Sequence, residues 1–217
     1  MQIALRRELE LVKIPGMHIF KITYPGTNLT DVPEPHTVLM QLNVLESSLA
    51  DAAVALNFFE QVHTVAPESR PVDSGLPGAP EGYRRRAPFI YAHTVVYSLD
   101  AIWKTLGLLA RTPGLPSNIG AIYDEYKQAL PRLKSVRDSA HHLEDRARRM
   151  GRNEEPLNVP VLSISNLFGD KLNYTGADGS QAEIAISPAS VAAAQKAIQK
   201  TLTSFAWTGS GYDVPHS

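Results

Sequence analysis

The sequence contains no cysteine, which excludes disulfide bonds and metal sites built from thiolates. This absence fits a reducing compartment, and we expect a cytoplasmic protein. The sequence has no apolar run of about 18 residues, the length that a membrane-spanning helix needs. Its first residues also lack the apolar core of a secretory signal peptide. We therefore expect no membrane association, and we find no internal repeat.

The chain also has almost no net charge, with a formal value of -1 and a pI near 6.7. A protein of this balance has no global attraction to nucleic acid, so any phosphate binding must come from a local patch. Its 217 residues are 43% hydrophobic and 20% charged, which is ordinary globular composition. The composition therefore predicts one folded domain with a sizeable core.

Apolar residues recur at helical spacing in four segments. The first runs from about residue 36 to 65, and the second is opened by Pro88 and stops near residue 112. The third begins at residue 117 or 118, and Pro131 interrupts it without changing the apolar phase, which predicts a kink in one long helix. Ser187 caps the fourth, with Pro188 at its first position. The apolar stripe of the first segment comprises Leu42, Leu45, Leu49, Ala52, Leu56 and Phe59. That of the third segment comprises Ile119, Ile122, Tyr126, Ala129, Leu133, Val136, Ala140 and Leu143.

Extended structure is expected around these helices. Residues 1–35 predict a short extended arm, in which residues 3–14 and 17–24 form the two strands of a hairpin. The proline- and glycine-rich stretch 67–88 predicts a long loop. A β insert is expected at about 159–186, in which residues 172–175 pair with 183–186 across a glycine-containing turn. Residues 36–207 would then form the main domain, and residues 208–217 a frayed tail.

The residues best suited to specific chemistry surround Arg137. At 100° per residue, Asp138 and His142 lie on one side of the predicted helix and can touch, whereas Arg137 lies about 140° from His142. All three fall off the buried stripe or on its flank, so we expect them to be displayed outward. Between residues 132 and 152 there are seven basic residues and three acidic ones, a local positive patch that the net charge hides. The alternative is a solvated face in which Asp138 pairs with His142 and Arg146.

The order Arg-Asp-x-x-x-His, followed by Leu143 and Glu144, resembles the Arg-x4-6-His signature of the HEPN superfamily. The order of elements over roughly residues 36–207 is similar to a bacterial HEPN-like group. Some HEPN proteins carry a tyrosine two residues after the histidine, where a partner nucleotidyltransferase modifies it. This chain has Glu144 there, so that regulation is not implied.

The resemblance implies a mostly α fold, a four-helix bundle with a small β-hairpin or meander between its third and fourth helices and a short N-terminal arm. It also implies a metal-independent endoribonuclease acting on single-stranded RNA. His142 would act as general acid or base on a ribose 2′-hydroxyl, Asp138 would orient its ring, and Arg137 would stabilise the charged phosphorane. Because one helix cannot assemble this site, we expect a homodimer with a shared Arg137/His142 cleft, without metal or cofactor.

Arg84, Arg85 and Arg86 precede the helix that Pro88 is expected to open, where the helix dipole disfavours cations. Their positive charges would be compensated by RNA phosphate, or by acidic residues of a second subunit or of the loop. We expect these arginines and Arg146 to bind substrate. Two other functions remain open: a non-catalytic dimeric scaffold, and a binder of a nucleotide or another small ligand. The flanks of this helix carry further polar residues without metal-site spacing, namely Tyr91, His93, Tyr97 and Asp100.

Overall fold

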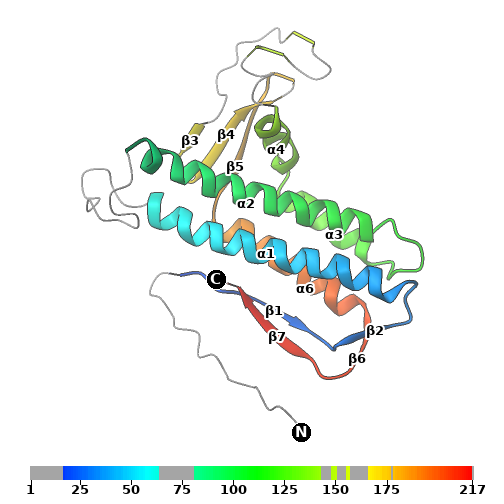
Figure 1. Cartoon of the computed structure of the whole chain (residues 1–217). Helices are drawn as coiled ribbons and strands as arrows, with labels where there is room; N and C mark the ends of the chain where they lie inside the picture. The colour runs from blue at the N-terminus through cyan, green and yellow to red at the C-terminus, as the bar shows by residue number, and fades with distance from the viewer. Residues whose placement is uncertain are drawn as a thin grey trace.

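The structure is a computed structural model that describes residues 17–63, 81–142, 148–150, 155–156, 166–176 and 178–216. The expected strand at residues 3–14, most of the expected loop 67–88 and most of the first part of the β insert lie outside these residues. The described chain forms a layer of long helices with small sheets at two of its edges (Figure 1).

Two long helices, α1 (Pro35–His63) and α2 (Glu81–Leu109), run antiparallel and pack along their whole length (Figure 1). The apolar stripe predicted for the first helix is confirmed, because all six of its residues are buried. On the facing helix, Val95, Val96, Leu99 and Ile102 are buried in the same core. Spacings of three and four residues thus place one continuous apolar ridge of each helix against the other.

The start of α2 corrects the prediction for Pro88. The proline lies inside the helix, which begins seven residues earlier at Glu81. A proline fixes φ near the helical value and removes a single donor, so a helix can continue through it when neighbouring packing offsets the loss. Ala87 and Pro88 are both buried, which supplies that packing. Arg84, Arg85 and Arg86 are therefore helical residues and do not precede a helix.

Pro131 separates two helices, and the single kinked helix that we predicted is wrong. The first, α3 (Ile119–Ala129), ends at Leu130, whose φ of -129° and ψ of 62° leave the helical region. The second, α4 (Leu133–His141), begins two residues after the proline. A residue before proline is pushed out of the helical region by contact with the ring, which explains the break. Of the predicted stripe, Leu133, Val136 and Ala140 are buried, but Ala129 is exposed and Leu130 is buried in its place.

A three-stranded antiparallel sheet lies beside α4 and follows it in the sequence (Figure 1). Its strands are β3 (Asn166–Phe168), β4 (Lys171–Thr175) and β5 (Gln181–Ala185). Leu172 pairs with Ile184, so the hairpin predicted from alternation and turn residues is confirmed. It is followed by α6 (Pro188–Ser204), whose predicted cap is also confirmed, because the Ser187 hydroxyl accepts a hydrogen bond from the Ser190 amide.

Two short antiparallel ribbons cover the opposite edge of the helical layer (Figure 1). In one, β1 (Phe20–Tyr24) pairs with β7 (Tyr212–His216), and in the other β2 (Asn28–Thr30) pairs with β6 (Ala206–Thr208). Alternate residues of β1 face the core, namely Phe20, Ile22 and Tyr24. The prediction of a frayed tail at residues 208–217 is therefore wrong. Its glycines lie between β6 and β7, each of which is paired with a strand of the N-terminal segment.

The fold class also differs from the expected four-helix bundle. Five helices and seven strands are present in the described residues, and they account for 57% and 19% of the structure. The three separate antiparallel sheets make the fold a mixed α/β arrangement. The helical periods alone predicted the helices, but the pairing of β1 with β7 and the break at Pro131 gave an architecture that those periods do not encode. No helix within the described ranges is long and apolar enough to cross a membrane.

Deleting residues 211–217 tests whether β7 is a structural strand. We expect the free energy of unfolding to fall by at least about 1 kcal/mol, because the truncation uncovers the buried face of β1 and removes Tyr212, which stacks on Tyr24 with ring centroids 4.9 Å apart. Urea denaturation of the full and shortened chains measures this difference. Equal stabilities would mean that the segment contributes nothing to the fold.

Candidate functional site

One side of α2 carries polar and aromatic residues that contact three other elements. His93 meets β4, Asp100 meets α4, and Trp103 meets α3. The three positions lie seven and three residues apart, so they share one helical face. The opposite side of α2 is occupied by α1. This polar face therefore positions the groups that surround the candidate site.

Arg137 lies against this face and not outward, which corrects the prediction of a displayed motif. Its side chain is only 18% exposed, and its Nε lies 3.1 Å from Oδ2 of Asp100, which is itself almost fully buried. The same Asp100 oxygen lies 2.8 Å from Nζ of Lys104. On its other side, Nη1 of Arg137 lies 2.6 Å from Oδ1 of Asp138. The guanidinium is therefore held between two carboxylates.

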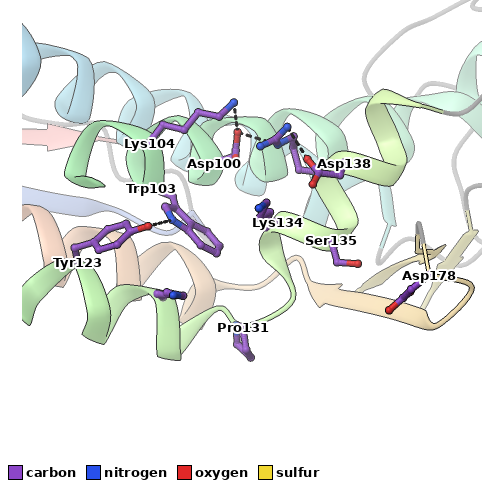
Figure 2. A pocket seen from close by; sticks show the side chains of 11 residues that line it. Asp100, Trp103, Lys104, Tyr123, Pro131, Lys134, Ser135, Asp138 and Asp178 are labelled. Carbon is purple, nitrogen blue, oxygen red and sulfur yellow. Dashed lines mark hydrogen bonds and ion pairs between the residues drawn. The ribbon is translucent and has the colours of Figure 1, made fainter. Parts of the chain in front are cut away.

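An open pocket of about 760 Å³ adjoins this ion-pair cluster. Figure 2 shows Trp103 and Tyr123 on one side of it, Asp178 on the other, and α4 with Lys134 and Ser135 between them. Four cationic and three acidic side chains line the pocket, so its charge is positive while the whole chain is slightly negative. The lining residues are Asp100, Trp103, Lys104, Tyr123, Lys127, Pro131, Lys134, Ser135, Arg137, Asp138 and Asp178.

Two of the cations in the pocket are not neutralised. Lys104 and Arg137 are paired with acids, whereas Lys127 and Lys134 have no ion-pair partner among the residues that the structure describes. Lys134 also lies in the first turn of α4, which has no acidic residue there and whose N-cap Arg132 forms no capping hydrogen bond. The positive end of a helix disfavours a cation, so Lys134 stands at an electrostatically unfavourable position.

The aromatic wall of the pocket is fixed by a hydrogen bond between helices. Nε1 of Trp103 donates to the Tyr123 hydroxyl at 2.7 Å, and the two rings meet edge to face. The facing wall is the β4–β5 turn, where Oδ1 of Asp178 accepts from the amide and the hydroxyl of Ser180. These bonds are the main cause that lowers the pKa of Asp178, with Arg132 contributing. Asp178 therefore carries a negative charge at neutral pH.

Beyond the pocket, the same face of α2 holds a second polar contact. Nε2 of His93 lies 2.5 Å from the hydroxyl of Tyr174, which is fully buried in β4. Burial lowers the pKa of His93, and the charge of Arg86 lowers it further, so the imidazole is neutral at pH 7. The ring of Tyr97 meets that of His141 edge to face at 5.3 Å. These contacts fix the sheet and the end of α4 against α2.

Among the remaining predicted site residues, the structure describes the side chains of His142 and Arg86. His142 caps the C-terminus of α4 with its side chain exposed, and its backbone amide donates to the carbonyl of Asp138 at 3.2 Å. Arg86 is exposed, with its guanidinium carbon 5.4 Å from the centre of the Phe89 ring. The side chains of Arg84 and Arg85, and all of Arg146, lie outside the described residues. No group of three metal-ligating side chains occurs in the part of the chain that the structure describes.

Sequence reasoning missed three features of this site: the role of Asp100, the Trp103–Tyr123 pair and the Asp178 turn. Only Asp100 had a usable signal, since an acid between the buried residues Leu99 and Ile102 of an apolar helix needs a cationic partner. Comparison with known proteins adds no relative, because no protein-family model, no curated protein and no solved structure matches the chain.

Replacing Asp100 with Asn should lower the free energy of unfolding by about 2 to 3 kcal/mol. The change leaves the largely buried Arg137 with one carboxylate instead of two, and breaking a buried pair is costly. Asp138→Asn is the matched control, because Asp138 is 37% exposed and should cost less than about 1 kcal/mol. Chemical denaturation of both variants checks the order, and equal losses would show that Asp100 does not anchor α4.

Proposed function

We propose that the pocket between α2, α3 and α4 binds a small phosphate-bearing ligand with a flat aromatic part, of which a nucleotide is the simplest example. The observation that carries this proposal is the position of Lys134 inside a pocket, in the first turn of α4, without an ion-pair partner among the described residues. A phosphate bound there would accept hydrogen bonds from the ammonium group and lie at the positive end of the helix. The positive charge of Lys134, which is unfavourable at this end of the helix, would then stabilise the bound phosphate.

The other lining residues support the same class of ligand. Lys127 provides a second ammonium group with no ion-pair partner in the described part of the chain, so a di- or triphosphate could be bound at two points. Trp103 and Tyr123 are half-buried, and their mutual hydrogen bond holds the indole in one orientation. A fixed indole face is a suitable surface for a nucleobase, because stacking needs no particular pattern of donors and acceptors.

Fluorescence of Trp103 provides a direct test. The second tryptophan, Trp207, is first replaced by Phe so that Trp103 is the only tryptophan. ATP and pyrophosphate should bind to this protein, and ATP should also quench its emission. Lys134→Ala should weaken both ligands at least about tenfold, because a hydrogen bond to a charged group is lost. The same substitution should leave stability unchanged or raise it by a few tenths of a kcal/mol, since it removes a cation from the positive end of α4.

Lys171→Ala is the control for charge alone, because Lys171 is an exposed lysine paired with Glu183 in the sheet. It should leave both affinities nearly unchanged. The absence of binding by ATP and pyrophosphate at millimolar concentration would contradict the proposal. So would equal weakening by Lys171→Ala and Lys134→Ala.

Metal-independent ribonuclease activity remains a second proposal, which the exposure of the His142 side chain favours. A substrate can reach this imidazole, and histidine is the residue type most often used for acid–base catalysis. Arg137 would have to rearrange for this reaction. Its guanidinium must leave at least one of its two carboxylate partners before it can stabilise a phosphorane. The predicted homodimer with a shared Arg137/His142 cleft belongs to this proposal.

His142→Ala should abolish cleavage of single-stranded RNA measured in EDTA, while costing less than about 1 kcal/mol of stability. The control is His36→Ala, which removes another exposed histidine from the first turn of α1. Diverse RNAs left intact by the unaltered protein would refute the nuclease. A monomer at micromolar concentration in light scattering would count against the shared cleft.

A further inference from the structure

We propose that Asp138 occupies the place of a ligand anion at Arg137, so that a bound phosphate must displace it and Asp138 thereby weakens the binding of every anion that uses Arg137. This inference rests on the proposed function of the same pocket. It concerns a different residue and the opposite effect. Asp138 would weaken ligand binding, whereas Lys134 would strengthen it. Asp138 would therefore set the affinity of the site for anions.

The two carboxylates at Arg137 differ in how firmly they are held. Asp100 has a side chain only 7% exposed and is also bound by Lys104, so it is fixed on the inner side of the guanidinium. Asp138 is 37% exposed, lines the pocket and meets Nη1 from the outer side. A buried charge cannot leave its partner without a large desolvation penalty, whereas an exposed ion pair is weak. Only Asp138 is therefore exchangeable.

The exchange requires little movement. Asp138 is the residue next to Arg137 on the surface of α4, and rotation about its Cα–Cβ bond turns the carboxylate away from the guanidinium and toward solvent. Arg137 would stay in place because Asp100 holds its Nε side. The guanidinium would then present its outer N–H groups to the pocket, in the planar arrangement that matches phosphate oxygens.

The competition also explains which anions would succeed. A ligand carboxylate would exchange one singly charged group for another of the same geometry, so it would gain little at Arg137. A phosphate with two negative charges and three terminal oxygens can bond to Arg137 and to Lys134 together, since both line the pocket. Displacing Asp138 costs every anion the same free energy, so only an anion with strong contacts of its own, such as phosphate, binds measurably.

The test compares Asp138→Asn with Asp178→Asn in binding of inorganic phosphate, pyrophosphate and acetate, measured by calorimetry. Each variant removes one negative charge from the pocket lining, but only Asp138 is paired with Arg137. Asp138→Asn should tighten both phosphate and acetate binding about fivefold or more, whereas Asp178→Asn should change each by about twofold.

A second comparison uses Arg137→Lys, which keeps a cation for Asp100 and removes the outer N–H group that Asp138 holds. In this background Asp138→Asn should tighten phosphate only as much as Asp178→Asn does. Asp138→Ser is the alternative substitution if the asparagine variant does not fold, as judged by circular dichroism.

The outcomes separate this inference from the function on which it rests. Phosphate binding that is equal in Asp138→Asn and Asp178→Asn would overturn the inference and leave the binding function standing. A persistent fivefold difference in the Arg137→Lys background would also overturn it. Binding by Asp138→Asn alone, with none by the unaltered protein, would overturn both, because phosphate would then fail to displace Asp138, and no binding by any variant would likewise overturn both.

Discussion

The antiparallel contact between α1 and α2 is the interaction on which the other elements depend. It buries an apolar ridge of each helix and fixes the rotation of α2 about its axis, so the polar residues of α2 point away from α1. His93, Asp100 and Trp103 can then receive β4, α4 and α3. A rotation of α2 by one residue, about 100°, would move all three contacts away from their partners. The pocket is therefore a consequence of packing on the far side of the helix.

Local sequence patterns predicted those elements whose structure is determined locally. The α1 stripe, the β4–β5 hairpin and the Ser187 cap of α6 each depend on residues close in the chain, and each is present. The pairing of β1 with β7 could not be predicted in this way, because alternation shows that a strand has one buried face but does not identify its partner. The tail was rich in glycine, and glycine occurs both in frayed ends and in tight turns.

The two prolines show why a single residue predicts a boundary poorly. Pro88 and Pro131 have the same chemistry, yet one lies within a helix and the other separates two. At Pro88 the proline itself and Ala87 are buried and Phe89 is partly buried, whereas at Pro131 the exposed proline follows the buried Leu130. The outcome is decided by tertiary packing, which can offset one lost hydrogen bond. Because the chain turns at Pro131, α4 lies beside the sheet and its N-terminus adjoins the pocket.

For the candidate site, the sequence indicated the correct segment but not its environment. Arg137 and Asp138 stood out as a motif, and Lys134 belonged to the predicted basic patch. Helical geometry placed Arg137 on the flank of the buried stripe, but whether a flank is solvated or covered depends on the neighbouring helix. Asp100 is the covering residue, and it comes from α2, 37 positions earlier in the sequence. The pairing of Trp103 with Tyr123 likewise joins separate helices and leaves no signal in either one alone.

The β1–β7 ribbon also determines when the chain can finish folding. Thr23 and Asp213 are hydrogen-bonded across it at 2.7 Å although they are 190 residues apart in the sequence. On the ribosome, β1 is made early, and its apolar residues Phe20 and Ile22 remain without a strand partner until β7 has been synthesised. Closing so long a loop is slow, and an unpaired strand can meanwhile associate with other chains. The nascent protein therefore carries an exposed strand while the segment between β1 and β7 is synthesised, and its yield in the cell should depend on how well that strand is shielded during this interval.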